Sequence, residues 1–517
     1  MRLLIPTAFV LFLCLSTTGC KKEKLEEKIE ETTEETNSTS TDSDKDSNEV
    51  NENKDEKEKI PINESDLFNK LTNGVLQGAQ EINVREFNIS SNKADSLYSA
   101  FLGKDPLLFH LKVNGNIGYK VDLENPTYLS AFLPQYAIQP VHIPEIYPSL
   151  EKRIEEFYSL LDYRMTSAEI AYTLYQKLCK DVIYGERNDE YPYLAYSSFS
   201  ALGAFLTRKV VCQGYSLSYS LLLNGLGIPT NYVTGAIAGT SGHAWNRIYI
   251  DGNWYNVDAT FDDASTYKLT GMGSINKYFL SSDNWFYTIF NHPQPHLNLK
   301  AEIYTASGNK FDDDKCVVRR YNPKNDEIKT EAVYADGYWY YLSMKDENMK
   351  IIKSDFNGLR AKELRQLNVS SKVSNLDKVQ CTKDRIYFID LINNKYHICS
   401  IDYNGNDFRQ GKQISYIEIA NKNFKLSPDD SQPTPVYKGK VALKAELMLA
   451  RLKLLYFHSD EDYFHLSHPQ AKELETFILQ TESDLKNKQM DDTQADILAQ
   501  QLRNIRKAYN QPSSIRP

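Results

Sequence analysis

The chain has 517 residues, with 60 Lys and Arg against 69 Asp and Glu, a formal net charge of −9 at pH 7 and 12% aromatic residues. This length allows two to four domains, and the aromatic content is ample for large hydrophobic cores. No basic cluster interrupts the acidic balance, so a nucleic-acid partner is not expected.

Residues 1–20 have the pattern of an export signal. An apolar run from Leu3 to Leu15 follows Arg2 and is too short to span a membrane as an ordinary helix. The ending Gly19-Cys20 resembles a bacterial lipoprotein signal, which implies that Cys20 is lipidated and that the protein lies at the outer face of the cytoplasmic membrane. An ordinary cleaved signal or an uncleaved anchor is the alternative interpretation.

The segment 21–61 is predicted to be an acidic, disordered tether. From Lys21 to Ile60 it contains fifteen acidic and eight basic residues and few apolar ones. Such a composition cannot bury enough apolar surface to fold. The acidity therefore belongs to the tether and says little about a substrate.

Residues 62–145 are predicted to form a small α+β module. Within it, Asn114-Gly115 is a turn signal between residues 109–113 and 117–122, which predicts a hairpin. Two helices are expected between Pro144 and Tyr184, and the second should open on the capping box from Thr166 to Glu169.

A helix is predicted to begin at Cys212, after an extended segment from Lys209 to Val211. Apolar and aromatic residues recur at helical spacing from Tyr215 to Leu226, and glycines at 225 and 227 supply the stop. Free N–H groups and the positive end of the helix dipole favour a thiolate at such a position.

The segment after this helix reads as a hairpin. Residues 243–250 and 253–259 flank Asp251-Gly252, a strong two-residue turn signal. With this loop Trp245 lies opposite Asp258, and His243 and Asp258 point to the same face as diagonal neighbours. A three-residue loop would place Asp258 on the opposite face.

Cys212, His243 and Asp258 together supply a nucleophile, a base and a group that orients the base. Taken singly, each has an ordinary structural interpretation: an inert buried thiol, a strand histidine and a helix cap. The segments VCQGYS at 211–216 and GHAWNRIYIDGNWYNVDAT at 242–260 resemble the transglutaminase-like superfamily. That resemblance implies a papain-like core at 146–300 in which Cys212 is the nucleophile, His243 the general base and acid, and Asp258 the orienting carboxylate.

Residues 301–435 contain an internal repeat and are expected to be rich in β-structure. The segment DGYWYY at 336–341, with IKSDFNG at 352–358, returns as KDRIYF at 383–388 with CSIDYNG at 399–405, an offset of 47 residues. An aromatic strand, a turn, a second strand and Asn-Gly are typical of propeller-like blades, although two units are too few to close a propeller.

Residues 436–517 are predicted to form a helical bundle, with three apolar stripes that include Leu447, Ile478 and Leu502. No cofactor and no metal are expected. His292 and His296 are separated by prolines in an apparent linker, and no CxxC or HExxH pattern occurs. Five cysteines lie beyond residue 20, an odd number without short paired spacing, although Cys381 and Cys399 leave room for one disulfide.

These observations predict an α+β protein with a papain-like transglutaminase core, a β-rich repeat region and a helical bundle. The expected function is extracytoplasmic, cysteine-dependent acyl transfer from amides, as a peptidase or amidase acting on surface or cell-wall proteins or peptides. A protein-crosslinking transglutaminase and a non-catalytic surface scaffold are the alternatives.

Overall fold

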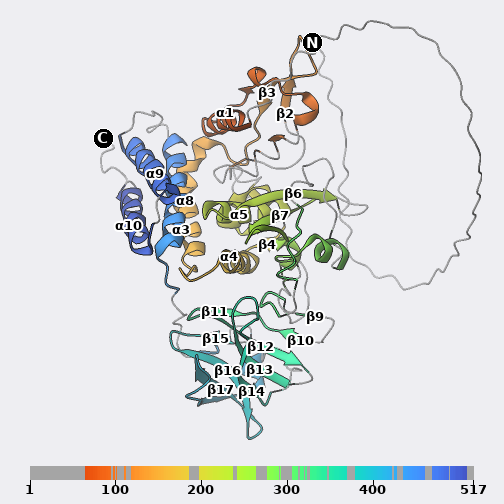
Figure 1. Cartoon of the computed structure of the whole chain (residues 1–517), viewed down its shortest axis with the longest axis vertical. Coiled ribbons are helices and arrows are strands. Elements are labelled where there is room, and N and C mark those ends of the chain that lie inside the picture. Colours follow the sequence, from red (N-terminus) through yellow and green to blue (C-terminus); the bar gives the residue numbers. More distant parts are fainter. Residues whose placement is uncertain are drawn as a thin grey trace, which may run out of the picture. The chain divides into compact units, whose positions relative to one another are not determined.

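The structure is a computed structural model (Figure 1). It describes residues 64–94, 97–98, 101, 110–111, 118–185, 197–236, 242–263, 276, 278–289, 292, 305–312, 315–319, 321–322, 327–345, 348–369, 379–421, 424–427, 435–459, 469–487 and 490–508. The predicted signal, Cys20, the tether and the turn at Asn114-Gly115 lie outside these residues. Among the helices described, none combines the length and the apolar character needed to cross a membrane.

The N-terminal module is a helix with a small antiparallel sheet of order β1-β3-β2. Its elements are α1 (Glu64–Leu76), β1 (Ile82–Asn83), β2 (Gly118–Val121) and β3 (Leu129–Leu133), with 3-10 turns at Arg85–Phe87, Ser91–Lys93 and Pro140–His142. It has its own apolar cluster, which includes Leu71, Phe101 and Phe132. The hairpin predicted around Asn114-Gly115 lies mostly outside the described residues; among those described, β2 pairs with β3 and Leu111 bridges Tyr136.

The two helices predicted between Pro144 and Tyr184 are present as α3 (Ile143–Tyr158) and α4 (Ser167–Asp181). The capping box is confirmed, because the Thr166 side chain accepts from the backbone N–H of Glu169 and the Glu169 carboxylate accepts from that of Thr166. The other oxygen of Glu169 accepts a 2.8 Å hydrogen bond from Nε1 of Trp339, which lies in the repeat region. The cap therefore also ties α4 to a distant segment.

The core places a buried helix against an antiparallel sheet of order β6-β7-β8. Its elements are β4 (Ile183–Tyr184) and β5 (Lys209–Val210), which pair in parallel, then α5 (Cys212–Gly225), β6 (Thr230–Ala236), β7 (Gly242–Ile250), β8 (Asn253–Val257) and α6 (Ala259–Asp262). A 3-10 turn at Ser197–Phe199 and π-helices at Gly203–Thr207 and Asn284–Ile289 complete the set. Helix α5 packs on β6 and β7 with Tyr215, Tyr219 and Leu222 fully buried. The predicted start of this helix at Cys212 is confirmed.

The hairpin β7–β8 has the predicted register. Ile250 pairs with Asn253 and Asn246 with Val257, so that the two-residue loop is Asp251-Gly252. Both loop residues have positive φ, 49° and 86°, as a type I′ turn requires.

The repeat region forms two antiparallel units whose strands begin 47 residues apart. The first contains β11 (Val333–Ala335), β12 (Tyr338–Lys345), β13 (Asn348–Ser354) and β14 (Lys362–Leu367); the second contains β15 (Gln380–Cys381), β16 (Arg385–Ile392), β17 (Lys395–Asp402) and β18 (Arg409–Ile414). Strands β9 (Tyr321–Asn322) and β10 (Glu327–Lys329) extend the first unit to six strands. Neither sheet closes into a barrel or a propeller within the residues described.

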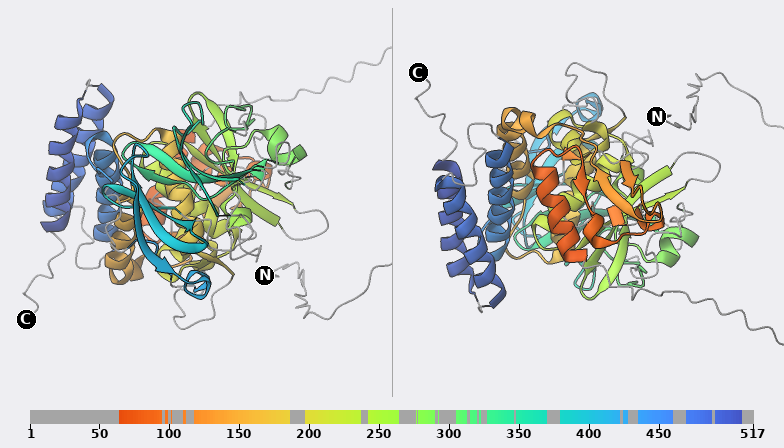
Figure 2. Two further views of the ribbon diagram at one scale, coloured as in Figure 1. Left: turned by 90° about the horizontal axis from the view of Figure 1, so that it is seen from below. Right: turned by 90° about the horizontal axis from the view of Figure 1, so that it is seen from above.

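The predicted helices at the C-terminal end are α8 (Gly439–Ser459), α9 (Pro469–Asn487) and α10 (Asp492–Ala508), preceded by the short α7 (Tyr416–Ala420). One face of α8 shares an apolar cluster with α9 and α10, including Leu447, Ile478 and Leu502. The other face, with Met448 and Leu452, belongs to the large cluster of the core. Figures 1 and 2 show α8 between α3 and the other two helices. The bundle is thus built onto the core through α8.

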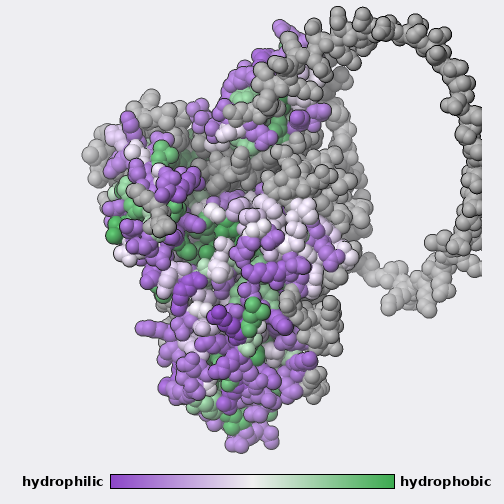
Figure 3. Space-filling model, in the orientation of Figure 1, coloured by the Kyte–Doolittle hydropathy of each residue, from purple (hydrophilic) through white to green (hydrophobic). Residues whose placement is uncertain are grey.

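The predicted α+β class, with a helix from Cys212 packed on an antiparallel sheet, is confirmed. On the face drawn in Figure 3 hydrophilic residues predominate. Large apolar side chains at the surface, such as Leu123, Leu359 and Ile417, come from different elements.

Candidate active site

Cys212 is the first residue of α5, and its side chain is 5% exposed. Val211, in extended conformation at the N-cap, makes no side-chain cap, so the helix end is not closed by a capping oxygen. Sγ of Cys212 lies 3.2 Å from Oε1 of Gln213, the next residue. The thiol therefore sits at the positive end of a helix dipole beside an amide group.

His243 is the second residue of β7 and is 5% exposed. Its ring stacks on that of Phe261, with centroids 4.5 Å apart, and Nε2 lies 2.6 Å from Oδ2 of Asp258. Because Nε2 faces Asp258, Nδ1 is the ring nitrogen left for the Cys212 thiol, which lies close enough to help raise the pKa of His243. One imidazole thus links the thiol to the carboxylate.

Asp258 follows β8 and is the N-cap of α6. Its Oδ1 accepts from the backbone N–H groups of Thr260 and Phe261, at 2.8 and 3.2 Å, whereas Oδ2 faces His243. The helix-cap interpretation and the orienting role are therefore both compatible with this residue, because each uses a different oxygen.

The charges of this pair are mutually stabilised. Burial alone would lower the pKa of His243, but the Asp258 carboxylate and the Cys212 thiol raise it to about 10. Burial alone would raise the pKa of Asp258, but His243 and His292 hold it well below its usual range. The geometry favours a protonated His243 at neutral pH, which is the partner that a thiolate needs.

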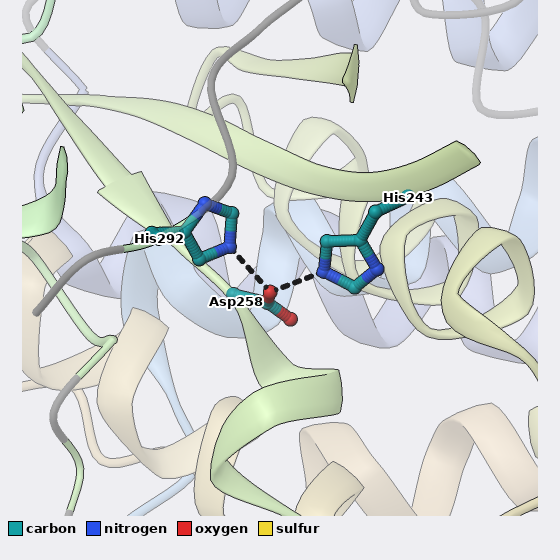
Figure 4. Close-up of side chains that lie close together, drawn as sticks. All are labelled: His243, Asp258 and His292. Atoms are coloured by element: carbon teal, nitrogen blue, oxygen red, sulfur yellow. Dashed lines mark hydrogen bonds and ion pairs between the residues drawn. The ribbon is translucent and has the colours of Figure 1, made fainter. Parts of the chain in front are cut away.

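His292 also belongs to the site, although the prolines that follow it had indicated a linker. Its side chain is buried, and Nε2 lies 2.8 Å from the same Oδ2 of Asp258 that His243 contacts (Figure 4). Its position 34 residues beyond Asp258 gave no local spacing that could have identified it. The neighbouring His296 lies outside the described residues.

The three residues His243, Asp258 and His292 also form a possible set of metal ligands, because their donor atoms lie within 4.8 Å of one another. Tetrahedral zinc with bonds of about 2.0–2.1 Å holds its donor atoms about 3.3 Å apart. Both nitrogens here approach Oδ2 more closely, at 2.6 and 2.8 Å. The arrangement fits a shared hydrogen-bond acceptor better than a metal centre.

The other four described cysteines lack this environment. Cys179, Cys316, Cys381 and Cys399 are all free thiols, so Cys381 and Cys399 are not joined in the structure. Burial and the nearby Asp262 raise the pKa of Cys179 well above its usual value, and burial raises that of Cys399 to about 11.

A thiol at a helix start, near an imidazole that contacts a carboxylate at the end of a β-hairpin, is an arrangement that papain-like cysteine cores share. The family model described as Transglutaminase-like superfamily matches residues 160–259, a segment that contains Cys212, His243 and Asp258. The chain therefore contains a transglutaminase-like domain.

Two solved structures are similar to parts of the chain. One is a TGase, at 17% identity over 36% of this chain and 50% of that protein, with a TM-score of 0.19. The other is a putative cysteine protease from Cytophaga hutchinsonii, at 17% identity over 28% of this chain and 61% of that protein, with a TM-score of 0.17. The chain thus spans one half and about three fifths of their lengths. No curated protein matches it.

Proposed function

We propose that this protein is an extracytoplasmic cysteine enzyme that cleaves amide bonds in proteins or peptides through a thioester. The observation that carries the proposal is the His243–Asp258 hydrogen bond of 2.6 Å beside the Cys212 thiol. Covalent acyl transfer needs a nucleophile, a base and a group that orients the base, and these three groups are buried close together here.

In the first half of the reaction the Cys212 thiolate attacks the amide carbon and forms a C–S bond. The carbonyl π electrons move to oxygen, and the N–H of Cys212 at the open helix end is placed to stabilise this oxyanion. When the intermediate collapses, the C–N bond breaks and His243 gives the Nδ1 proton to the leaving amine. A thioester and a neutral His243 remain.

A second oxyanion donor is expected from the side chains around the thiol. Gln213 is one candidate: its Oε1 accepts from Sγ of Cys212 at 3.2 Å, so a turn of the amide would be needed to present its N–H to the oxyanion. Tyr232 of β6 is a second candidate. Burial raises the pKa of its hydroxyl, and the charge of the nearby Cys212 raises it further. Removal of one oxyanion donor in other enzymes lowers kcat by about 10²–10³-fold.

In the second half His243 takes a proton from the acceptor. If water is the acceptor, hydroxide displaces the thiolate and the product is a carboxylic acid. If a lysine amine is the acceptor, the product is an isopeptide and the protein is a crosslinker. We favour water, as in the peptidases that share this core.

The cellular setting belongs to the same proposal. The signal pattern at 1–20 and the tether that follows support a protein anchored through lipidated Cys20 and acting on surface or cell-wall proteins or peptides. Replacement of Cys20 by Ala should abolish incorporation of a labelled fatty acid and release the protein from membranes.

Alkylation of the full-length protein by iodoacetamide at pH 7 tests the nucleophile. Peptide mass spectrometry should show Cys212 reacting about tenfold or more faster than Cys179, Cys316, Cys381 and Cys399, since only a thiolate reacts well and ordinary thiols are mostly protonated at this pH. Cys179 is the most informative comparison, because it is more exposed than Cys212 and would react first if accessibility decided the rate.

Two histidine variants make the matched comparison. His243→Ala should slow the alkylation of Cys212, whereas His397→Ala, which also removes a strand histidine, should not. Equal reactivity of all five cysteines would instead favour a non-catalytic surface scaffold.

The acceptor is identified from the products. A cell-wall protein digest incubated with the enzyme in ¹⁸O-water should yield new C-termini that carry the label. Gln–Lys isopeptides without labelled termini would identify a crosslinking transglutaminase instead.

A further inference from the structure

The carboxylate of Asp258 has every acceptor position occupied. Oδ1 accepts from two backbone N–H groups, those of Thr260 and Phe261, and Oδ2 lies within hydrogen-bond distance of both His243 and His292. A carboxylate offers about four lone-pair sites, so four donors saturate it. The two histidine contacts are not equivalent, since only His243 is also near enough to the Cys212 thiol for the thiol to raise its pKa.

His292 is held both by the π-helix Asn284–Ile289 and by Trp245 of the hairpin strand β7. Its backbone N–H donates to the carbonyl of Phe286, at 3.0 Å, in the π-helix Asn284–Ile289. Its ring lies 3.9 Å from that of Phe286 and 4.8 Å from that of Trp245 between centroids, and its side chain is fully buried. A ring packed in this way delivers its N–H to Oδ2 from a fixed direction (Figure 4).

We infer that His292 is a positioning residue that acts on catalysis through Asp258. Donation from Nε2–H of His292 keeps Asp258 ionised and fixes the rotation of its carboxylate, so that Oδ2 stays aligned with Nε2 of His243 and Nδ1 stays directed at the Cys212 thiol. The inference rests on the proposed cysteine mechanism and adds a residue outside the triad and outside the matched segment 160–259.

This role makes distinct predictions for two substitutions. His292→Gln keeps an N–H at about the position of Nε2, whereas His292→Leu keeps the buried volume but removes the donor. In metalloenzymes, removal of a residue that hydrogen-bonds to a metal ligand and orients it typically lowers metal affinity or activity about 10–100-fold. A decrease of the same order in the Cys212 alkylation rate is expected here. The leucine variant should lose that factor in the alkylation rate of Cys212, and the glutamine variant should stay within about threefold of the parent.

A double-mutant cycle in the full-length protein separates positioning from packing. If His292 acts through Asp258, adding His292→Leu to Asp258→Asn should cause no further loss of the Cys212 alkylation rate. A purely structural role predicts the same fold loss in both backgrounds. Equal rates for the leucine variant and the parent, equal losses for leucine and glutamine, or an unchanged loss in the Asp258→Asn background would each overturn the inference.

Proton NMR of the ring N–H groups provides a readout that does not depend on the leucine variant folding. The parent should show two strongly hydrogen-bonded ring protons; His292→Gln should remove one and shift the other, and Asp258→Asn should move both. A proton of His243 that is insensitive to His292→Gln would contradict the coupling. If Cys212 reacts no faster than the other thiols in the parent, the proposed function fails and the inference fails with it. If Cys212 is alkylated fast but its rate does not change when His292 is substituted, the inference fails and the proposed function stands.

Discussion

Gly214 and Val210 approach so closely that a Cβ on Gly214 would lie 2.5 Å from Cβ of Val210. The carbonyl oxygen of Ser198 would lie 2.6 Å from the same atom. Neither neighbour is the flexible end of a side chain, so the first turn of α5 can approach β5 only with glycine at this position. This contact sets the depth at which Cys212 is held.

Gly214→Ala is therefore expected to displace the start of α5. Overpacking of this kind costs about 1–3 kcal/mol, and the alkylation rate of Cys212 should fall because the thiol moves away from His243. Chemical denaturation and iodoacetamide kinetics measure the two effects. Gly242→Ala is the matched control: it lies beside His243, but its Cβ would have no neighbour closer than 3.7 Å. Similar effects of the two substitutions would refute the packing argument.

The raised pKa of His243 predicts the alkaline limit of activity. Its folded value of about 10 lies above the usual 6.5, so the imidazolium persists through neutral pH and is lost only as the pH approaches 10. A pH profile of kcat/KM should show its alkaline limb near 10, since His243 must protonate the leaving amine.

The same shift predicts a stability effect of known sign. A group with a raised folded pKa stabilises the fold fully below its unfolded pKa, and this contribution is lost as the pH rises from about 6.5 through 10. The difference in unfolding free energy between the parent and His243→Ala should therefore shrink over this range. A difference that grows with pH would contradict the assignment.

The ion pairs of Arg506 indicate how strongly the stability of α10 depends on its packing against α3 and α8. Its buried guanidinium contacts Glu151 and Glu155 of α3 and Glu446 of α8. Arg506→Met would remove the cation that is ion-paired with the buried Glu151 carboxylate, and breaking a buried ion pair typically costs about 3–5 kcal/mol. Urea unfolding measures this loss.

Arg503 provides the control on the same helix. It pairs with Glu446 at 2.8 Å, but its side chain is 31% exposed. Arg503→Met should therefore cost at most about 1 kcal/mol. Equal losses for both variants would show that the depth of burial does not decide the effect.

Removal of metal ions is expected to leave the chemistry intact. His243 and His292 share Oδ2 of Asp258 as hydrogen-bond donors, so neither nitrogen needs an ion to be satisfied. Dialysis against EDTA should change neither the alkylation rate of Cys212 nor amide cleavage. Loss of activity that is restored by zinc but not by calcium would identify a metal centre at these three residues.

The sequence by itself determined the features that depend on neighbouring residues. Backbone chemistry fixes the start of α5 at Cys212, the capping box at Thr166 and the turn at Asp251-Gly252, and the register of that turn follows from its length. The repeat of 47 residues was visible because each unit carries its own strand pattern. His243 and Asp258 could be paired in advance for this reason: they lie on the two strands of one short hairpin.

Only the tertiary structure decided the contacts between distant segments. It brought His292 to Asp258, joined Trp339 to Glu169 and buried α8 on two faces. Such contacts leave no periodicity or spacing in the sequence, because packing selects them after the local elements have formed. The pairing of His243 with Asp258 follows from short-range rules, whereas its support by His292 is a property of the fold.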